Sequence, residues 1–221
     1  MATPDGVTLA RTLLDDYLRR IEEICKERRN SQDVQHAMSN PNFKTEQHRL
    51  MDRLAAEYVC NLPLIERPPF ATIEVGTFKT VADLRQTLVA SNFRIGNWAS
   101  DLLDRPEFTL LTEPAKLDLY MASNAELGYP NGCTVAQSFE ALEKIGAVKL
   151  PPEAGAQYRL RYADQPLNEW RLMYMDPIAD SIGCLEVLAV VRNDGGLWLY
   201  GDYASPSYFY VGGGVWVFAR K

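Results

Sequence analysis

The last part of the chain, from Tyr158 onward, contains a series of short segments with strong strand character. They read YRLRYA, EWRLMYM, LEVLAVVRN, GLWLYGDY and VWVFARK, and turn residues separate them. Each is rich in aromatic and β-branched residues, which fit the pleated, half-buried surface of a sheet. Successive short strands with tight links are typical of an antiparallel meander. We therefore expect an antiparallel sheet in this region.

The segment before these strands alternates strand and helix patterns. A strand over ATIEV precedes a helix that begins at Thr80, with Asp83 in a position like that of a capping box. Further on, we expect a short helix over NWASDLLD, a strand over LDLYMAS, and a helix over TVAQSFEALEKIG that ends at Gly146. The predicted fold class is therefore α+β, with helices packed on an antiparallel sheet.

The N-terminal region predicts a helical hairpin. In residues 8–29, Leu14, Leu18, Ile21 and Cys25 form one apolar stripe at helical spacing. A second helix is expected over residues 43–60, and a polar link joins the two. The prolines of LPLIERPPF then indicate an extended connector. We place the boundaries at 1–61 for the hairpin, 62–69 for the linker and 70–221 for the α+β domain.

Composition and charge exclude several classes of function. The chain is 47% hydrophobic with a net charge of −6 and no dense Lys/Arg cluster, so neither general nucleic-acid binding nor membrane-surface binding is expected. No apolar run approaches the roughly 20 residues that cross a bilayer. The N-terminus lacks the pattern of a secretory signal, and Cys25, Cys60, Cys133 and Cys184 are too far apart for a C-x-x-C motif. We expect a cytoplasmic protein with reduced, mostly buried thiols.

Cofactor and metal motifs are missing from the sequence. The chain has no P-loop and no G-x-G-x-x-G before a helix, which disfavours nucleotide cofactors. Its histidines, His36 and His48, both lie in the N-terminal region, far from any nucleophile of the α+β domain. The segment from Asp176 to Gly183 lacks the ligand spacing of a calcium loop. The sequence therefore predicts no cofactor and no metal.

Asp164 and Glu169 are the candidate catalytic pair. They flank QPLN, which we interpret as the turn of a hairpin. Directly paired residues of a hairpin lie about 5 Å apart, and two carboxylates that close raise one another's pKa. Such a pair serves acid–base chemistry if it lies in a cleft, and is a solvated loop tip if it does not. Both interpretations stay open at this point.

Aromatic residues are the candidate binding residues. The C-terminal segments place Tyr203, Tyr208 and Tyr210 in or beside a loop rich in glycine, serine and proline, and Trp170 follows Glu169. Rings with a polar group are favoured at binding surfaces. Trp198 and Trp216, in contrast, fit core positions, because alternation along a strand buries about half of its side chains.

The C-terminal segments resemble a family of uncharacterised bacterial proteins. The resemblance rests on GAQYRLRYADQPLNEWRLMYMDPIADS and GLWLYGDYASPSYFYVGGGVWVFARK, and it extends upstream to about residue 75. Departures from the family pattern include Leu167-Asn168, where a glycine is usual, and Tyr208-Phe209-Tyr210, where tryptophan is usual. No activity is established for the family, so the resemblance implies only that residues 70–221 form one unit.

The leading hypothesis is a cytoplasmic, non-enzymatic binding protein. Residues 8–60 would mediate self-association or contact a protein partner, and the aromatic C-terminal surface would recognise a ligand. One alternative is a carboxylate-dependent hydrolase of a glycan or similar polar substrate, with Asp164 and Glu169 as the acid–base pair and Trp170 as a stacking platform. Another alternative is an accessory protein of a mobile genetic element, which rests on the resemblance alone.

Overall fold

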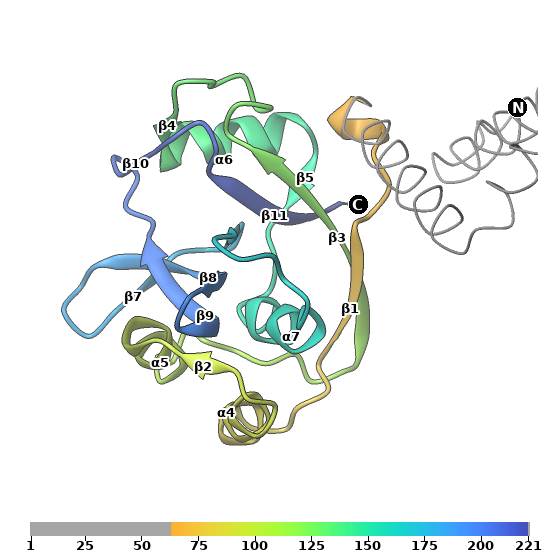
Figure 1. Ribbon diagram of the computed structural model, residues 1–221, viewed down its shortest axis with the longest axis vertical. Coiled ribbons are helices and arrows are strands. Elements are labelled where there is room, and N and C mark those ends of the chain that lie inside the picture. The colour runs from red at the N-terminus through yellow and green to blue at the C-terminus, as the bar shows by residue number, and fades with distance from the viewer. Residues whose placement is uncertain (1–62, 221) are drawn as a thin grey trace, which may run out of the picture. The chain divides into compact units, whose positions relative to one another are not determined.

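A computed structural model describes residues 63–220 of the chain (Figure 1). The chain divides into two compact units, Met1–Pro68 and Pro69–Lys221. In the described part of the first unit, residues Leu64–Glu66 form the 3-10 helix η1. The predicted helical hairpin over residues 1–61 lies outside the described residues. None of the helices between residues 63 and 220 has the length and apolar character needed to cross a bilayer.

The second unit is built on a nine-stranded sheet. Its strands follow the order β1-β3-β11-β6-β8-β9-β2, with β5 beside β11 and β7 beside β8. The strands are β1 (Ala71–Val75), β2 (Arg94–Ile95), β3 (Ala115–Ser123), β5 (Ala147–Val148), β6 (Trp170–Met173), β7 (Ile178–Ala179), β8 (Leu185–Asn193), β9 (Gly196–Tyr203) and β11 (Val215–Arg220). A separate two-stranded sheet pairs β4 (Cys133–Thr134) with β10 (Phe209–Tyr210).

This topology corrects the predicted fold class, because the sheet is mixed and is not an antiparallel meander. The last strand, β11, inserts between β3 and β6 and runs parallel to β6, with Trp216 opposite Leu172. β2 also runs parallel to β9. Among the predicted strands, β6, β8 and β9 are antiparallel neighbours in chain order, as the prediction requires, but β11 departs from it. Strand signals in the sequence report that a segment is extended, but they carry no information on which distant strand it joins.

Four helices accompany the sheet in the described part: α4 (Val81–Ala90), α5 (Asn97–Leu103), α6 (Val135–Lys144) and α7 (Ala154–Arg161). Local sequence explains two of their starts. The Thr80 side chain accepts a hydrogen bond from the Asp83 backbone N–H, 3.1 Å away, at the start of α4. Thr134 and Gln137 form a complete capping box at the start of α6. Both starts agree with the sequence prediction.

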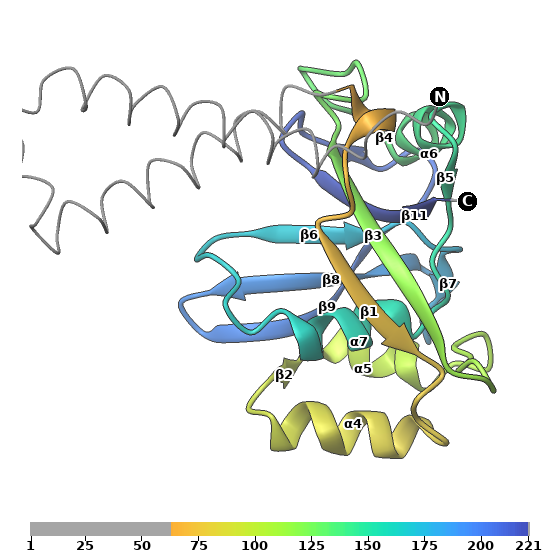
Figure 2. The same ribbon diagram turned by 90° about the vertical axis from the view of Figure 1, so that its right-hand side faces the viewer.

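Helix α7 is the exception, because it forms where YRLRYA predicted a strand. The sheet curls around this helix, while α4 and α5 lie at the open end of the curl (Figures 1 and 2). Residues Ala154 to Arg159 are all buried. A Cβ atom at Gly155 would come within 3.0–3.1 Å of side-chain atoms of Leu188 and Met173, so glycine permits the close approach of α7 to the sheet.

Different helices pack on the two faces of the sheet. On the inner face, α7 packs over β8 at Leu188. On the other face, Phe139 of α6 makes edge-to-face ring contacts with Trp216 and Tyr174, at centroid distances of 5.2 and 4.9 Å. Trp216 is completely buried, which confirms its predicted core position. The outer face beyond α6, over β8 and β9, carries the candidate site.

Candidate functional site

The candidate site begins with the alternation of side chains along β9. Side chains two positions apart share a face of a strand, so Trp198, Tyr200 and Asp202 lie on the same face. The register places Trp198 opposite Val191, and Val191 opposite Trp170 of β6. The rings of Trp170 and Tyr200 meet edge to face, with centroids 5.3 Å apart. The outer face of the sheet therefore carries a row of aromatic side chains.

Asp202 joins this row to the β10 segment. Its carboxylate accepts from the Tyr203 backbone N–H at 2.9 Å, and the nearby donors of Tyr210 and Trp170 lower its pKa. The Tyr210 hydroxyl donates its proton to the Tyr203 carbonyl, 2.8 Å away. Desolvation by burial has the largest effect on Asp202 and raises its pKa, whereas the hydrogen-bond donors around its carboxylate lower it. One carboxylate thus lies among rings that come from three segments of the chain.

A second run of ring contacts continues from Tyr203. Tyr203 contacts Tyr208 at 5.3 Å and Trp98 of α5 at 5.4 Å, and Tyr208 contacts Tyr210 at 5.1 Å. Trp170 and Tyr208 are each 40% exposed and Trp98 is 41% exposed, although such rings are usually well buried. Tyr203 follows Asp202 and points toward the inner face, where Trp98 lies, so these ring contacts continue around the end of β9. We call the whole run of rings the aromatic face and define it by Trp98, Trp170, Trp198, Tyr200, Asp202, Tyr203, Tyr208 and Tyr210.

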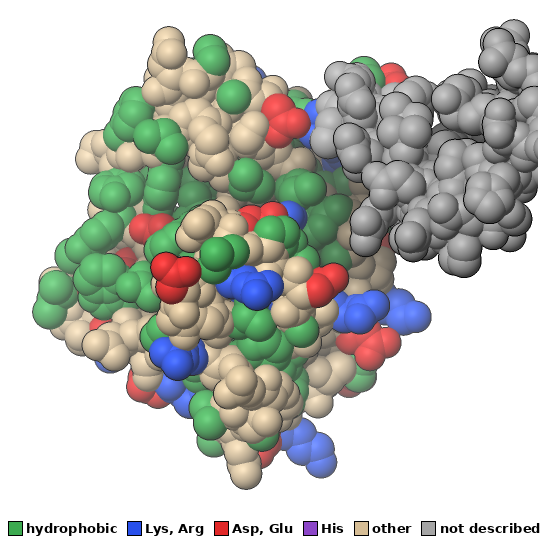
Figure 3. Space-filling model, in the orientation of Figure 1, with side chains coloured by type: hydrophobic (Ala, Val, Ile, Leu, Met, Phe, Trp, Pro, Cys, Tyr) green, Lys and Arg blue, Asp and Glu red, His purple; other side chains and the backbone are tan. Residues whose placement is uncertain are grey.

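Figure 3 shows the side of the molecule that carries β9, β10 and the turn before β8. Hydrophobic side chains gather there, with acidic side chains among them. Contiguous exposed apolar surface of this kind marks interaction sites in soluble proteins more often than it occurs by chance. The aromatic face therefore has the composition of a recognition surface.

A buried polar network fixes the support of the aromatic face. The side-chain carbonyl of Asn124 accepts from the Trp216 indole N–H at 3.1 Å and from the Ser138 hydroxyl at 2.9 Å. The Asn124 amide donates to the Val211 carbonyl, 3.1 Å away, just after β10. Tyr210 packs edge to face on Trp216, with centroids 5.8 Å apart. The loop that carries Tyr208 and Tyr210 is thus tied to the core.

Below Tyr203 lies a carboxylate without a partner, that of Glu186. Glu186 is completely buried, and neither of its carboxylate oxygens has a hydrogen-bond partner. Burial raises its pKa to about 7, and the nearby carboxylates of Asp180, Asp202 and Asp101 add to the effect. Glu186 is paired in register with Tyr203, so its side chain lies on the inner face of the sheet with Leu188, opposite to the face of Trp170, Tyr200 and Asp202. The carboxylates of Glu186 and Asp202 are nevertheless close enough across the sheet to interact.

Glu153 shows what a satisfied buried carboxylate looks like in the same protein. Glu153 is also completely buried, and it accepts hydrogen bonds from the backbone N–H groups of Gly76 (3.1 Å) and Leu111 (2.6 Å) and from the Gln157 amide (3.2 Å). Those donors hold three segments together at the start of α7. Glu186 has no comparable structural role, which makes it a candidate for a functional one.

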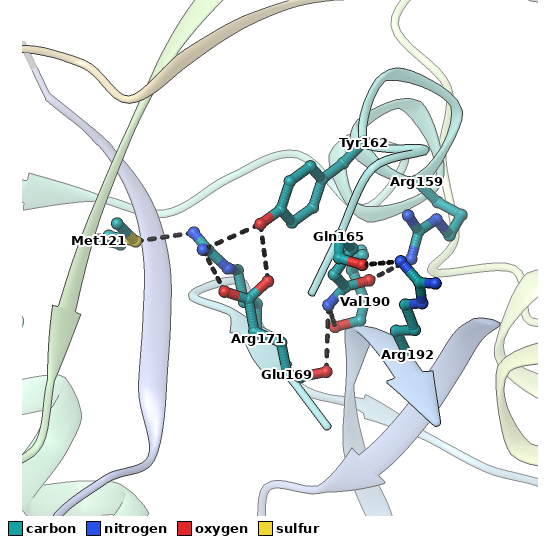
Figure 4. Close-up of polar contacts among 8 residues, drawn as sticks. All are labelled: Met121, Arg159, Tyr162, Gln165, Glu169, Arg171, Val190 and Arg192. Atoms are coloured by element: carbon teal, nitrogen blue, oxygen red, sulfur yellow. Dashed lines mark hydrogen bonds and ion pairs between the residues drawn. The ribbon is translucent and has the colours of Figure 1, made fainter. Parts of the chain in front are cut away.

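The predicted catalytic pair does not flank a hairpin turn. Asp164 and Glu169 lie in the loop between α7 and β6, because residues before Asp164 form a helix. The Glu169 carboxylate pairs with the Arg171 guanidinium at 2.6 Å and accepts from the Tyr162 hydroxyl at 2.8 Å. Figure 4 shows these three side chains pointing toward one another. Asp164 is exposed and lines, with Tyr162 and Arg171, a cavity of about 450 Å³.

Gln165 holds this loop in place. Its side-chain carbonyl accepts from Arg159, and its amide donates to the backbone carbonyls of Glu169 and Val190, each 3.1 Å away (Figure 4). Arg159 is completely buried and lies over the Phe93 ring at 5.0 Å. Burial lowers its pKa to about 10. Gln165 and Arg159 thus form a structural clamp on the residues that precede Trp170.

Neither tyrosine of this region is activated as a nucleophile. Burial and the hydrogen bond to Glu169 raise the pKa of Tyr162 to about 12, and burial raises that of Tyr158 beyond its usual range. Among residues 63–220, no group of three or more His, Cys, Asp or Glu side chains has an arrangement that could hold a metal ion. Cys133 is buried and Cys184 half-buried, and both are free thiols.

The structure brings together all the residues predicted to bind. Trp170, Tyr203, Tyr208 and Tyr210 converge around Asp202, which the sequence analysis did not single out. Trp198, predicted as core, is half-buried and belongs to the same surface. The alternation of GLWLYGDY was a sufficient signal for placing Asp202 on the face of Trp198 and Tyr200. No sequence signal indicated Trp98 or Glu186, because both arrive through distant packing.

Comparison with known proteins identifies no relative. No family model matches the chain, and no match was found among the curated proteins or the solved structures. The assignment of a function therefore depends on the geometry of the site.

Proposed function

We propose that the protein is a non-enzymatic binding protein and that the aromatic face is its recognition surface. The observation that carries the proposal is the convergence of exposed rings from α5, β6, β9 and the β10 segment around Asp202. Tryptophan and tyrosine contribute a large contact area at a low cost in side-chain entropy, and they dominate the energetics of protein interfaces.

Rigidity supports this proposal. Trp170 on β6 and Tyr200 on β9 stand on strands that both pair with β8, and the loop of Tyr208 is fastened by the hydrogen bond from the Val135 N–H to the Tyr208 carbonyl, at 2.9 Å. A surface that is held in its binding geometry loses little conformational entropy when a partner binds. The aromatic face thus has both the composition and the order that recognition needs.

The hydrolase alternative finds less support in the geometry. Acid–base catalysis needs two carboxyl groups that can exchange protons with a substrate. Glu169 already has an ion pair with Arg171 and a hydrogen bond from Tyr162, while Asp164 lies on the exposed rim of the cavity. The proposal as an accessory protein of a mobile genetic element has no structural observation in its favour.

Two further parts of the proposal concern assembly and compartment. We infer that residues 8–60 add self-association or a contact with a protein partner, on the strength of their amphipathic pattern. We also assign the protein to the cytoplasm. The free thiols of Cys133 and Cys184 support that assignment, since reduced thiols persist in reducing compartments.

Site-directed photocrosslinking in cells tests the proposed surface. A photoreactive phenylalanine analogue replaces Tyr208 on the aromatic face or, as a control, Val89 on α4, which is 64% exposed. We expect discrete crosslinked products from position 208, lost when Trp170→Ala is added, and none from position 89. The same products from both positions, or products from position 208 that survive Trp170→Ala, would show that the aromatic face is not the recognition surface.

A further inference from the structure

Negative charge accumulates at the aromatic face without compensation. The carboxylates of Asp180 and Asp202 raise the pKa of Glu186, and none of these three residues forms an ion pair with a Lys or Arg among residues 63–220. Asp101 is the only member of the group with a cation, Arg105, at 2.7 Å. Buried or half-buried carboxylates are usually paired, since an uncompensated charge in a low-dielectric region is unfavourable.

Glu186 lies close enough to the aromatic face for its charge to act there. A Cβ atom on Gly201 would lie 2.5 Å from a Glu186 carboxylate oxygen and 2.8 Å from the Cβ of Trp98. Only the bare glycine backbone therefore separates the carboxylate from the first turn of α5. Tyr203 is its register partner, and Asp202 is the next residue along β9.

Aromatic rings and carboxylates attract the same kind of group. The face of an aromatic ring carries partial negative charge and binds ammonium or guanidinium groups, most strongly at tryptophan. The chain already shows this preference, because the guanidinium of Arg94 lies over the Trp198 ring at 5.3 Å, at one end of the aromatic face. At the other end, Trp170 and Tyr210 lie beside Asp202, and no cation of residues 63–220 lies over the rings of Trp170, Tyr203, Tyr208 or Tyr210.

From this complementarity we propose that the aromatic face binds a lysine or arginine side chain presented by a basic segment of a partner protein. The inference rests on the proposed function and names the chemistry of its partner. The cation would lie over the rings of Trp170 and the tyrosines, with its charge opposite Asp202. The partner carries the positive charge that this part of the chain lacks.

The breadth of the surface favours a protein segment over a small ammonium ligand. The rings come from α5, β6, β9 and the β10 segment, which are far apart in the sequence and meet through a continuous run of ring contacts. An extended segment can cover such a surface, whereas a single small cation would leave most of it exposed to water. The net charge of −6 also steers a basic partner toward the chain.

The inference includes a dependence on pH. Glu186 titrates at about 7, and the groups that face it are Asp180 from the turn before β8, Asp202 from β9, and Asp101 from α5 with its partner Arg105. A cation binds more tightly once Glu186 is ionised. Affinity for a basic segment is therefore expected to rise as the pH increases from 6 to 8, and Glu186→Gln should flatten this dependence.

An unbiased selection tests the inference with the full-length protein. A library of randomised peptides is enriched on immobilised wild-type chain and, in parallel, on Asp202→Asn, Trp170→Ala and Asp194→Asn variants. Asp194 is exposed in the turn between β8 and β9, so Asp194→Asn makes the same change in net charge as Asp202→Asn but away from the aromatic face. The winning peptide is then synthesised with lysine and with acetyl-lysine, which keeps the aliphatic part of the side chain and removes its charge.

We expect lysine or arginine at one fixed position of the enriched peptides. Acetylation at that position should weaken binding at least about tenfold, as loss of a cation over a ring and near a carboxylate requires. Asp202→Asn and Trp170→Ala should weaken binding similarly, and Asp194→Asn should leave it nearly unchanged.

The contrary outcomes separate this inference from the proposed function. Enriched peptides without a fixed cation that still need Trp170 would overturn the inference and leave the aromatic face as the recognition surface. Equal losses of binding with Asp202→Asn and Asp194→Asn would show that only the net charge matters, which would also overturn the inference. Enrichment that is indifferent to Trp170→Ala, or no enrichment at all, would count against both.

Discussion

Replacement of Glu186 by glutamine should make the protein more stable at alkaline pH. Glutamine keeps the shape of the side chain and removes the charge. Glu186 is completely buried and its oxygens have no partner, so ionisation places an uncompensated charge inside the fold. Most carboxylates of folded proteins stabilise the native state when they ionise, but ionisation of Glu186 destabilises it.

The magnitude follows from the difference between the folded and unfolded pKa. The ordinary value for glutamate is 4.5, and the folded chain raises the pKa of Glu186 to about 7. Between these values the folded state binds a proton that the unfolded state has lost, so stability falls as the pH rises through this window and is flat above it. The full loss between pH 5 and pH 8 is about 2.5 kcal/mol, and screening by water near the site reduces the expected loss to about 1.5–2 kcal/mol.

Urea unfolding followed by tryptophan fluorescence is the appropriate assay. All four tryptophans lie in the second unit, at positions 98, 170, 198 and 216, so the signal reports this unit alone. The quantity to compare is the change in unfolding free energy between pH 5 and pH 8, for wild type, Glu186→Gln and the exposed control Asp194→Asn. A comparison across pH cancels the cost of burying the new amide, which is the same at both values.

We expect wild type and Asp194→Asn to lose about 1.5–2 kcal/mol more than Glu186→Gln over this interval. Identical pH dependence in all three proteins would refute the reasoning. It would mean that Glu186 is ionised in the folded state at pH 5, and hence that a partner or water satisfies its carboxylate.

Three other predictions concern packing, the loop clamp and assembly. Gly155→Ala should destabilise the second unit by about 1–3 kcal/mol in the same urea assay, because the new methyl group meets Leu188 and Met173; no loss of stability would mean that α7 can shift. Gln165→Ala should cost about 2–4 kcal/mol, because it leaves the buried Arg159 with only the long hydrogen bond to the Val191 carbonyl, and a loss below 1 kcal/mol would contradict the role of the clamp. Leu18→Asp, on the predicted apolar stripe, should lower the solution mass measured by light scattering, and an unchanged mass would exclude self-association through that stripe.

The sequence predicted the elements with local signals and failed where distant packing decides. The starts of α4 and α6 follow from Thr80 and Thr134, whose caps depend only on residues within one turn. Residues 158–162 alternate aromatic or aliphatic side chains with arginine, which is the pattern of a strand. They form the end of α7 and its first following residue instead, because Arg159 is buried against Phe93 and Gln165, where the alternation predicts a solvated charge. No local rule anticipates a buried arginine whose acceptor is an amide.

The same distinction applies to the site. Alternation along β9 determines that Trp198, Tyr200 and Asp202 share a face, and this is readable from eight consecutive residues. The position of β11 beside β6, and of α5 against β9, depends on the closure of the whole sheet. Trp98 and Glu186 are brought near the other site residues only when the whole sheet has formed. Sequence patterns therefore identified the candidate binding residues but did not reveal the buried carboxylate of Glu186 near them.

The charge of Glu186 connects stability with recognition. A bound cation near Glu186 lowers the free energy of the ionised carboxylate, so it lowers its pKa, and by linkage deprotonation must favour the cation by the same amount. The ionisation that weakens the fold as the pH rises toward 7 would therefore be the one that strengthens the proposed binding. A partner that supplies the missing positive charge recovers in the complex the stability that the free protein lacks. The cost of an unpaired, buried carboxylate at Glu186 is thus explained if the protein works as the complex and not as the free chain.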